Sequence, residues 1–280
     1  MASVIDLHCH STASDGKLAP SALVERAAGQ GVEVLALTDH DTLAGQQEAR
    51  GAAERLGIQL VSGIELSCVW GGATIHIVGL DMQLDSAAMQ QAEVAQLEAR
   101  KQRAHTIAER LSRRLHTDIP LAEIQRYAGG ELVGRPHFAQ YLVDQQLVPS
   151  MAVAFKKYLG AGKPGDVKAN WPALEQVVRW IVDAGGIAVL AHAHLYKMTR
   201  TKLRACISDF IDAGGRALEV SYGNMDADQQ RRMVALAQEF ELLGSCGSDF
   251  HGPNRFGLDL GVMPAFPADI EPVWQHFRSA

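Results

Sequence analysis

The sequence predicts an α/β fold, a distorted seven-stranded (β/α) barrel with an inserted helical subdomain. Seven short apolar, β-branched segments recur along the 280 residues, and most are separated by amphipathic stretches with helical spacing. One long central segment has helical spacing and no strand pattern. Alternating strands and helices with short connections favour a parallel sheet with right-handed crossovers. Seven such strands suggest an irregular barrel, one strand short of eight.

The expected strands share runs of apolar and β-branched residues bounded by turn-forming residues. They lie at residues 4–7, 34–37, 59–62, 73–80, 187–191, 217–220 and 242–245. The expected helices lie at 20–30, 42–56, 171–184, 201–213 and 226–240. Pro20 and Pro172 suit first helical turns, where a missing N–H costs nothing. Gly57, Gly185 and Gly214 suit helix C-termini.

The inserted subdomain is expected at residues 95–165. A stretch from 86 to 116 has the composition of one long helix, and shorter helical pieces follow at 121–128, 136–145 and 151–159. The glycine-rich segment 160–165 is expected to be a loop that returns to the barrel. Residues 1–94 and 166–280 would then form the barrel domain. The alternative is that these helices are extra helices of a single domain.

Composition excludes several classes of protein. A hydrophobic content of 47% and a charged content of 21% are those of a globular chain. No apolar run approaches a membrane span, no signal peptide is evident, and the four cysteines form no CxxC pair. We therefore expect a cytoplasmic protein with reduced thiols and no obligate protein partner. The net charge of −6 argues against a broad nucleic-acid surface, but not against a small anionic substrate held through metal.

Histidines and carboxylates gather beside the expected strands. They are His8, His10 and Asp15 after the first, His40 after the second, Glu65 after the third, His76 within the fourth, His192 and His194 after the fifth, and Asp249 and His251 after the seventh. The carboxyl ends of barrel strands meet at one face, so these side chains should converge. Imidazole with carboxylate suits Mn, Fe or Zn. Each motif alone is more often structural, but the combination predicts a metal site.

These motifs resemble those of the PHP (polymerase and histidinol phosphatase) family over almost the whole chain. The matching segments read DLHCHS at 6–11, TDHD at 38–41, GIE at 63–65 and SDFH at 248–251. The Gly134-Arg135-Pro136-His137 segment is similar to a stand-alone bacterial, TrpH-like subgroup. The resemblance implies a metal-dependent phosphoesterase on a distorted seven-stranded barrel of the amidohydrolase-like group.

The resemblance also implies a site with two or three divalent ions, manganese first, with zinc, iron or magnesium as alternatives. The first ion would take His8, His10, Glu65 and Asp249. The second would share Glu65 and add His76 and His192, and the third would take Asp15, His40 and His251. Two such ions can hold a bridging hydroxide and clamp phosphoryl oxygens for in-line attack.

The activity implied is removal of the 3′-phosphate of nucleoside 3′,5′-bisphosphates, which leaves the 5′-monophosphate. The alternatives are a 5′→3′ exonuclease on short 5′-phosphorylated RNA and a non-catalytic metal-binding module. Arg135 is the candidate for a second phosphate, and His194 for protonating the leaving oxygen. His137 and Lys168 are weaker candidates for substrate contacts. For each of these four an ordinary structural or solvated role is the alternative. The basic residues of the long helix, Arg100 and Arg103 among them, could guide RNA, but a solvated face is favoured over that role.

Overall fold

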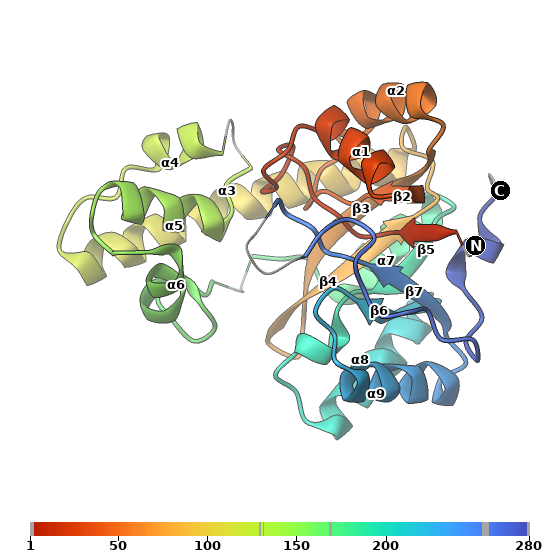
Figure 1. The fold of residues 1–280 in the computed structure, drawn as a ribbon. Helices are drawn as coiled ribbons and strands as arrows, with labels where there is room; N and C mark the ends of the chain where they lie inside the picture. The colour runs from red at the N-terminus through yellow and green to blue at the C-terminus, as the bar shows by residue number, and fades with distance from the viewer. Residues whose placement is uncertain (1–2, 129, 131, 168–169, 254–257, 279–280) are drawn as a thin grey trace.

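A computed structural model describes residues 3–128, 130, 132–167, 170–253 and 258–278. Among these residues, seven strands form one sheet in chain order (Figure 1). They are β1 (Val4–Asp6), β2 (Val32–Leu37), β3 (Gln59–Trp70), β4 (Ala73–Leu80), β5 (Ile187–Leu190), β6 (Ala217–Tyr222) and β7 (Leu243–Gly247). The predicted α/β class and the predicted place of each strand along the chain are confirmed.

One strand runs against the others, so the expectation of a wholly parallel sheet is wrong. β4 pairs antiparallel with both β3 and β5, whereas the other neighbouring strands pair in parallel. The cause is the turn Gly71-Gly72, in which both residues have positive φ, 53° and 76°. Two glycines in this conformation make the tight connection of a β-hairpin. β3 therefore continues to Trp70, and Glu65 lies within the strand instead of after it.

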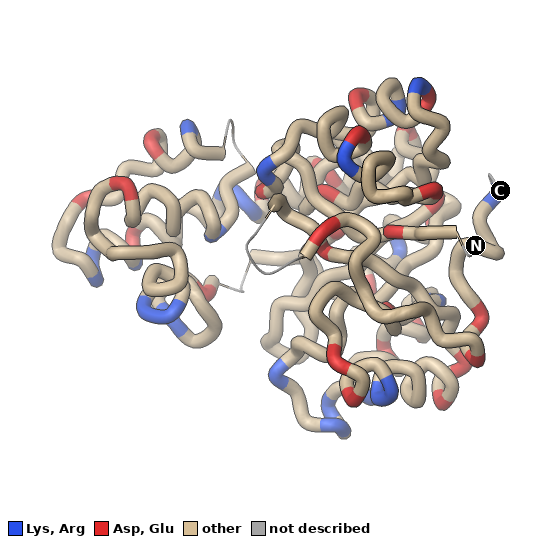
Figure 2. The backbone as a smooth tube through the Cα atoms, viewed as in Figure 1, with Lys and Arg blue, Asp and Glu red and all other residues tan. Residues whose placement is uncertain are grey.

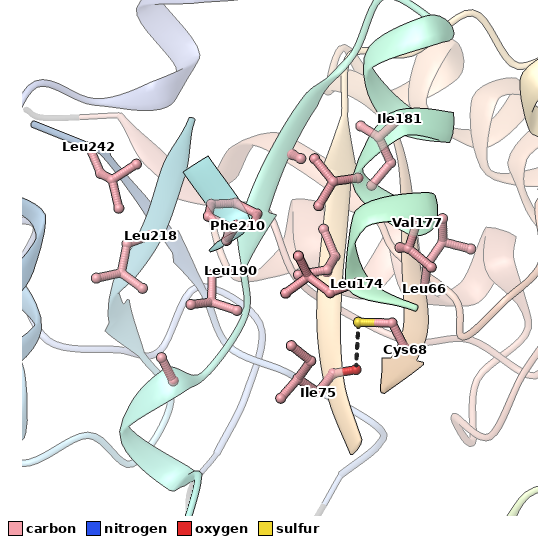
Figure 3. Close-up of a cluster of buried hydrophobic side chains, with 14 of the residues drawn as sticks. Leu66, Cys68, Ile75, Leu174, Val177, Ile181, Leu190, Phe210, Leu218 and Leu242 are labelled. Atoms are coloured by element: carbon pink, nitrogen blue, oxygen red, sulfur yellow. Dashed lines mark hydrogen bonds between the residues drawn. The ribbon is translucent and has the colours of Figure 1, made fainter. Parts of the chain in front are cut away.

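Five helices pack against the sheet, namely α1 (Pro20–Gly29), α2 (Gln46–Leu56), α7 (Leu174–Asp183), α8 (Arg200–Asp212) and α9 (Ala227–Glu239). In Figure 1, α1 and α2 lie together at one side of the sheet and α8 and α9 at the other. Two 3-10 turns, η2 (Ala193–Leu195) and η3 (Val273–His276), follow β5 and β7 in the chain. Figure 3 shows how apolar side chains join sheet and helices: Leu66, Leu190 and Leu218 from strands face Val177 and Phe210 from helices.

The central segment forms the helical structures that the sequence predicts. It contains α3 (Ala87–Leu115), α4 (Leu121–Tyr127), α5 (Arg135–Asp144), α6 (Met151–Ala154) and a short π-helix, η1 (Phe155–Leu159). α3 runs from the sheet outward, and the others gather around its far end in Figure 1. Leu111, Phe138 and Leu142 belong to a hydrophobic cluster made by these helices and by residues of the adjoining loops, such as Val167. We call α4, α5, α6, η1 and the outer half of α3 the helical lobe.

The two ends of the strand order lie next to each other. The N–H of Leu7, directly after β1, donates to the carbonyl of Cys246 in β7 at 3.0 Å. The N–H of Asp249, after β7, donates to the carbonyl of His8 at 2.8 Å. These bonds bring the first and the last predicted metal-ligand segments together. In the described part of the chain, no helix has the length and apolar character of a membrane span.

Candidate metal centre and substrate cavity

The structure brings all nine predicted metal ligands together at one end of the sheet. Four overlapping groups, found among the described residues, have ligand atoms within 4.8 Å of one another. The groups are His8, His10 and Asp249; His8, Glu65 and His192; His40, Glu65 and His76; and His10, Asp15, His40 and His251. Because β4 runs antiparallel, its first residues lie at this end, and His76 reaches Glu65.

Glu65 lies at the centre of the cluster, with imidazole nitrogens around both carboxylate oxygens. Its Oε1 lies 2.8 Å from His76 Nδ1, 3.0 Å from His192 Nε2 and 3.4 Å from His8 Nε2. Its Oε2 lies 2.7 Å from His40 Nδ1 and 3.3 Å from His10 Nε2. The side chain is 1% exposed. A carboxylate in this position can contribute one oxygen to each of two ions.

The other two carboxylates lie at opposite sides of His10 and His251. Asp249 Oδ1 lies 3.0 Å from His10 Nε2 and 3.4 Å from His8 Nε2. Asp15 Oδ1 lies 3.2 Å from His251 Nε2 and 4.0 Å from His40 Nε2. The first expected set contains the group His8, His10 and Asp249, and the third lies within the group His10, Asp15, His40 and His251, whereas His76 and His192 of the second set fall in different groups, each with Glu65.

The donor atoms fit metal ions better than they fit one another. Six buried side-chain atoms of the cluster have no hydrogen-bond partner among the described residues: His8 Nε2, both ring nitrogens of His10, Asp15 Oδ1, His40 Nδ1 and Glu65 Oε2. His40 Nδ1 and Glu65 Oε2 are only 2.7 Å apart, yet lack the geometry of a hydrogen bond. Buried polar atoms are normally paired. Ligand atoms that converge without pairing are what a bound cation requires.

Mutual charge sets the protonation of the cluster. Burial would raise the pKa of Glu65, but His40, His76 and His8 hold it well below its usual range. Burial, together with His251 and His40, lowers the pKa of His10 to about 3. The imidazole of His10 is therefore neutral, and its Nε2 lies near one oxygen of Glu65 and one of Asp249. A neutral imidazole in this position is suited to bind a cation.

Further buried groups, not assigned from the sequence, hold the ligand loops. Asp39 accepts hydrogen bonds from the N–H and hydroxyl of Ser11 and from the hydroxyl of Ser14, which fixes the loop that carries Asp15. The hydroxyl of Tyr222 donates to Asp249 Oδ2 at 2.6 Å and leaves Oδ1 facing the histidines. Asp39 stands beside His40 in the sequence, but nothing in a single sequence distinguishes such a supporting carboxylate from a ligand.

A cavity of about 390 Å³ opens on the cluster. Asp15, His40 and His76 line it on the metal side, and Arg100, Arg103 and Arg135 line it from α3 and α5. The region between β4 and β5 thus supplies one wall of the cavity. This volume is within the range of small-molecule sites.

Arg100 and Arg103 are buried, so the solvated face expected for them is wrong. Each is 7% exposed, and both guanidinium groups lie over the ring of Trp171, at 5.5 and 5.3 Å from its centroid. Arg100 is paired with Asp41 at 2.6 Å. Arg103 donates to the carbonyl of Val167. Burial and the neighbouring guanidinium groups lower the pKa of Arg103 to about 9. Three guanidinium groups, those of Arg100, Arg103 and Arg135, thus line this wall, and that of Arg100 is paired with Asp41.

The predicted substrate residues differ in where they lie. Arg135 lines the cavity and donates to the carbonyl of Leu159 at 3.2 Å. His137 accepts the N–H of Gly134 on Nδ1 and so caps the start of α5. His194 lines a second cavity, of about 320 Å³, between η2, α8 and α9. Lys168 lies outside the described residues.

Comparison with known proteins shows the family of this chain. The PHP domain family matches residues 6–114. A 3′,5′-nucleoside bisphosphate phosphatase of Chromobacterium violaceum is 39% identical over 98% of this chain and 96% of its own length. A 5′-3′ exoribonuclease of Haemophilus influenzae is 43% identical over 97% of this chain and 98% of its own. A solved amidohydrolase from C. violaceum has a TM-score of 0.91, with 39% identity, and the match covers 99% of this chain and 96% of that one.

The chain belongs to the PHP family of metal-dependent phosphoesterases. It is a hydrolase by class, with a cluster of candidate metal ligands at one end of the sheet. The two relatives named above differ in substrate, a nucleotide for one and RNA for the other.

Proposed function

We propose that this protein is a metal-dependent phosphatase that removes the 3′-phosphate of nucleoside 3′,5′-bisphosphates and releases the 5′-monophosphate. The observation that carries the proposal is the single cavity with a metal cluster on one wall and three arginines on the other. A substrate with two phosphates on one nucleoside matches two anion-binding walls. The C. violaceum relative is named for this activity.

His8, His10, Glu65 and Asp249 would hold the first ion, Glu65, His76 and His192 the second, and Asp15, His40 and His251 the third. We propose manganese, with zinc, iron or magnesium as alternatives, because the donors are imidazoles and carboxylates. Bound divalent ions would supply Lewis-acid polarisation of the phosphoryl oxygens and activation of water. Glu65, shared by two sets, would keep two ions close. His194 has no role in this proposal, because it lines the second cavity.

The fold is proposed to be the distorted barrel that the sequence predicts, made of residues 1–94 and 166–280, with residues 95–165 as the inserted subdomain. The backbone bonds between the ends of β1 and β7 support closure. One buried apolar cluster also joins β2, β3, β5, β6 and β7 through Ala36, Val61, Val189, Ala217 and Leu243. The separate apolar cluster of the helical lobe supports the subdomain.

Arg135 is proposed to bind the 5′-phosphate while the metal side holds the 3′-phosphate. Guanidinium offers two parallel donors to phosphate oxygens, which an ammonium group cannot reproduce. Arg135→Ala should lower kcat/KM for a nucleoside 3′,5′-bisphosphate. The decrease should correspond to a loss of about 2–3 kcal/mol of transition-state stabilisation. A substrate with a 3′-phosphate only should be hydrolysed poorly by the parent and be little affected. Equal loss on both substrates would contradict this role, and Arg135→Lys serves as the charge-retaining control.

The second candidate function is a 5′→3′ exonuclease on short 5′-phosphorylated RNA. The H. influenzae relative, at 43% identity, favours it. Both reactions cleave at a 3′ oxygen beside a nucleotide with a 5′-phosphate, so the same arginine wall could serve either. Figure 2 shows basic and acidic residues side by side along the helical lobe, which gives no preference to a long polyanion over a single nucleotide.

A phosphate-release assay decides between these functions. The purified protein with added Mn²⁺ is given a nucleoside 3′,5′-bisphosphate, the matching 5′-monophosphate, and a short 5′-phosphorylated RNA. Rapid phosphate release from the bisphosphate alone supports the phosphatase. Release of mononucleotides from RNA at a higher kcat/KM would favour the exonuclease. Absence of both activities, with metal bound, would overturn the proposal.

A further inference from the structure

Glu219, in the middle of β6, is a buried carboxylate that lies behind the metal cluster. It is 1% exposed and lines neither of the two cavities described above. Its two oxygens contact two different predicted ligands, which follow β1 and β5 in the chain. Oε1 lies 2.7 Å from His8 Nδ1, and Oε2 accepts the backbone N–H of His192 at 2.5 Å.

The first contact determines which nitrogen of His8 can bind an ion. A carboxylate only accepts hydrogen bonds, so the proton of the imidazole must lie on Nδ1. In the neutral imidazole, Nε2 then carries the lone pair, and it lies 3.4 Å from both Glu65 Oε1 and Asp249 Oδ1. Nε2 is buried and has no hydrogen-bond partner among the described residues. Two carboxylate oxygens beside a lone pair are consistent with a cation between them.

The second contact holds the backbone of His192 in a conformation that residues other than glycine rarely adopt. His192 has φ 32° and ψ 43°, in the left-handed region, directly before the η2 turn. This conformation turns the imidazole toward Glu65, with Nε2 and Oε1 3.0 Å apart. The hydrogen bond to Glu219 offsets the strain of the left-handed backbone.

We propose that Glu219 is a positioning residue for two metal ligands at once. It keeps Nε2 of His8 free for an ion and holds the His192 backbone so that its ring meets Glu65. The inference rests on the proposed metal sites but not on the proposed substrate. In many metal sites, a carboxylate that accepts a hydrogen bond from a ligand histidine orients that ligand.

Glutamine cannot replace Glu219, although it has the same shape. Both partners of Glu219 are donors, and the amide has one accepting oxygen only. The backbone N–H of His192 can never accept, so the amide oxygen stays with it. The amide NH₂ then faces His8 Nδ1, which must accept, and the proton of His8 moves to Nε2. Glu219→Gln therefore blocks the nitrogen that would bind the ion.

The test reads the proton directly. ¹⁵N-histidine-labelled parent and Glu219→Gln protein are compared by long-range ¹H–¹⁵N NMR with diamagnetic Zn²⁺, and a His8→Asn variant assigns the signals. The parent should show a proton on Nδ1 of His8 and coordinated Nε2. The variant should show the proton on Nε2 and bind the Zn²⁺ of that site more weakly, on the order of 10–100-fold. A variant with an unchanged Nδ1 proton and unchanged Zn²⁺ affinity would overturn the inference.

Asp6→Asn is the matched control. Asp6 is a fully buried carboxylate beside the same loops, and it accepts the backbone N–H groups of His8, Ser248 and Gly261 and a hydrogen bond from the Ser248 side chain. Asp6→Asn should lower the free energy of unfolding and leave the proton of His8 on Nδ1. If Glu219→Gln does not fold, Glu219→Ala with added formate gives the same answer: Zn²⁺ affinity that returns with formate supports the role, and a folded variant without recovery contradicts it. A parent that binds no metal would instead refute the metal sites and the proposed function.

Discussion

Glu65 makes the largest number of close contacts of any residue in the metal cluster. Imidazole nitrogens lie 2.7 to 3.4 Å from its two oxygens. Glu65→Gln keeps the shape but replaces one cation-binding oxygen by an amide nitrogen. We expect phosphate release to fall on the order of 100-fold or more, as when one electrostatic group is removed from an active site. Bound metal, measured by elemental analysis, should fall more than in His76→Asn or His192→Asn. A Glu65→Gln protein with parental metal content and activity would contradict the bridging role.

The convergence of the candidate metal ligands could be predicted from the combination of motifs, but the burial of Arg100 and Arg103 could not. Each ligand follows or lies in a strand whose apolar pattern is plain, so the fold itself brings the ligands together. Arg100 and Arg103 lie three apart on a long helix with charged residues throughout. Their burial depends on contacts with Asp41 and Trp171, which are remote in sequence. Helical spacing alone does not say which basic stripe of a helix faces the protein.

At the scale of elements, a buried ion pair joins α3 to the segment after β2. Asp41, after β2, accepts from the guanidinium of Arg100, and also from the N–H of Ser67 in β3 at 2.6 Å. Asp41→Asn keeps the shape and tolerates the φ of 57° at this position. It leaves Arg100 buried without a counter-charge. We expect a loss of about 3 kcal/mol or more in the free energy of unfolding, measured with urea.

The control for this prediction lies on the same helix. Glu109 and Arg113 form an exposed pair in α3, 3.9 Å apart. Glu109→Gln should leave the urea midpoint unchanged within error, because exposed pairs contribute little. Equal effects of Asp41→Asn and Glu109→Gln would show that the buried pair does not hold α3.

The strand pattern of the sequence predicts where the strands lie along the chain, but not the direction of the fourth strand. Alternation of strands and helices predicts that neighbouring strands are parallel. The hairpin turn Gly71-Gly72, between the third and fourth strands, makes the fourth strand antiparallel to its neighbours. The third strand was expected to end at residue 62, since Gly63 reads as a strand end. Gly63 instead lies within β3, where a Cβ would come 2.7 Å from the Leu37 carbonyl. The glycine marks a close backbone approach.

The C-terminal segment is attached to α1 by a second ion pair with a pH dependence. Arg26 donates to both oxygens of Asp259, at 2.7 and 2.6 Å, and these bonds lower the pKa of the carboxyl. A carboxyl whose pKa is lower in the folded state than in the unfolded state stabilises the fold at pH values above its unfolded-state pKa, near 3.8. This stabilisation is lost as the pH falls through the folded-state pKa. Asp259→Asn should cost about 1 kcal/mol at neutral pH. Urea unfolding of both proteins should show the difference shrinking only below about pH 4; a difference that vanishes by mildly acidic pH would contradict the pair.

For the whole molecule, the metal cluster joins parts of the chain that are far apart. His8 and Asp249 come from opposite ends of the sequence, and Glu65 and His192 come from opposite sides of the central helical segment. An ion bound by such a set can exist only when the sheet is assembled. Ligands that bind the folded state and not the unfolded state stabilise the fold by mass action.

We therefore expect Mn²⁺ to raise the Tm of the metal-free protein. A single site at a hundredfold excess over its Kd adds about 2.7 kcal/mol, and independent sites add to this. For a chain of this size the shift should be several degrees, measured by calorimetry with and without a chelator. Glu65→Gln should reduce the shift, since it affects two ligand sets, whereas Glu109→Gln should keep it in full. A parent protein whose Tm is the same with Mn²⁺ and with chelator would refute the cluster as a site for divalent ions, whatever its substrate.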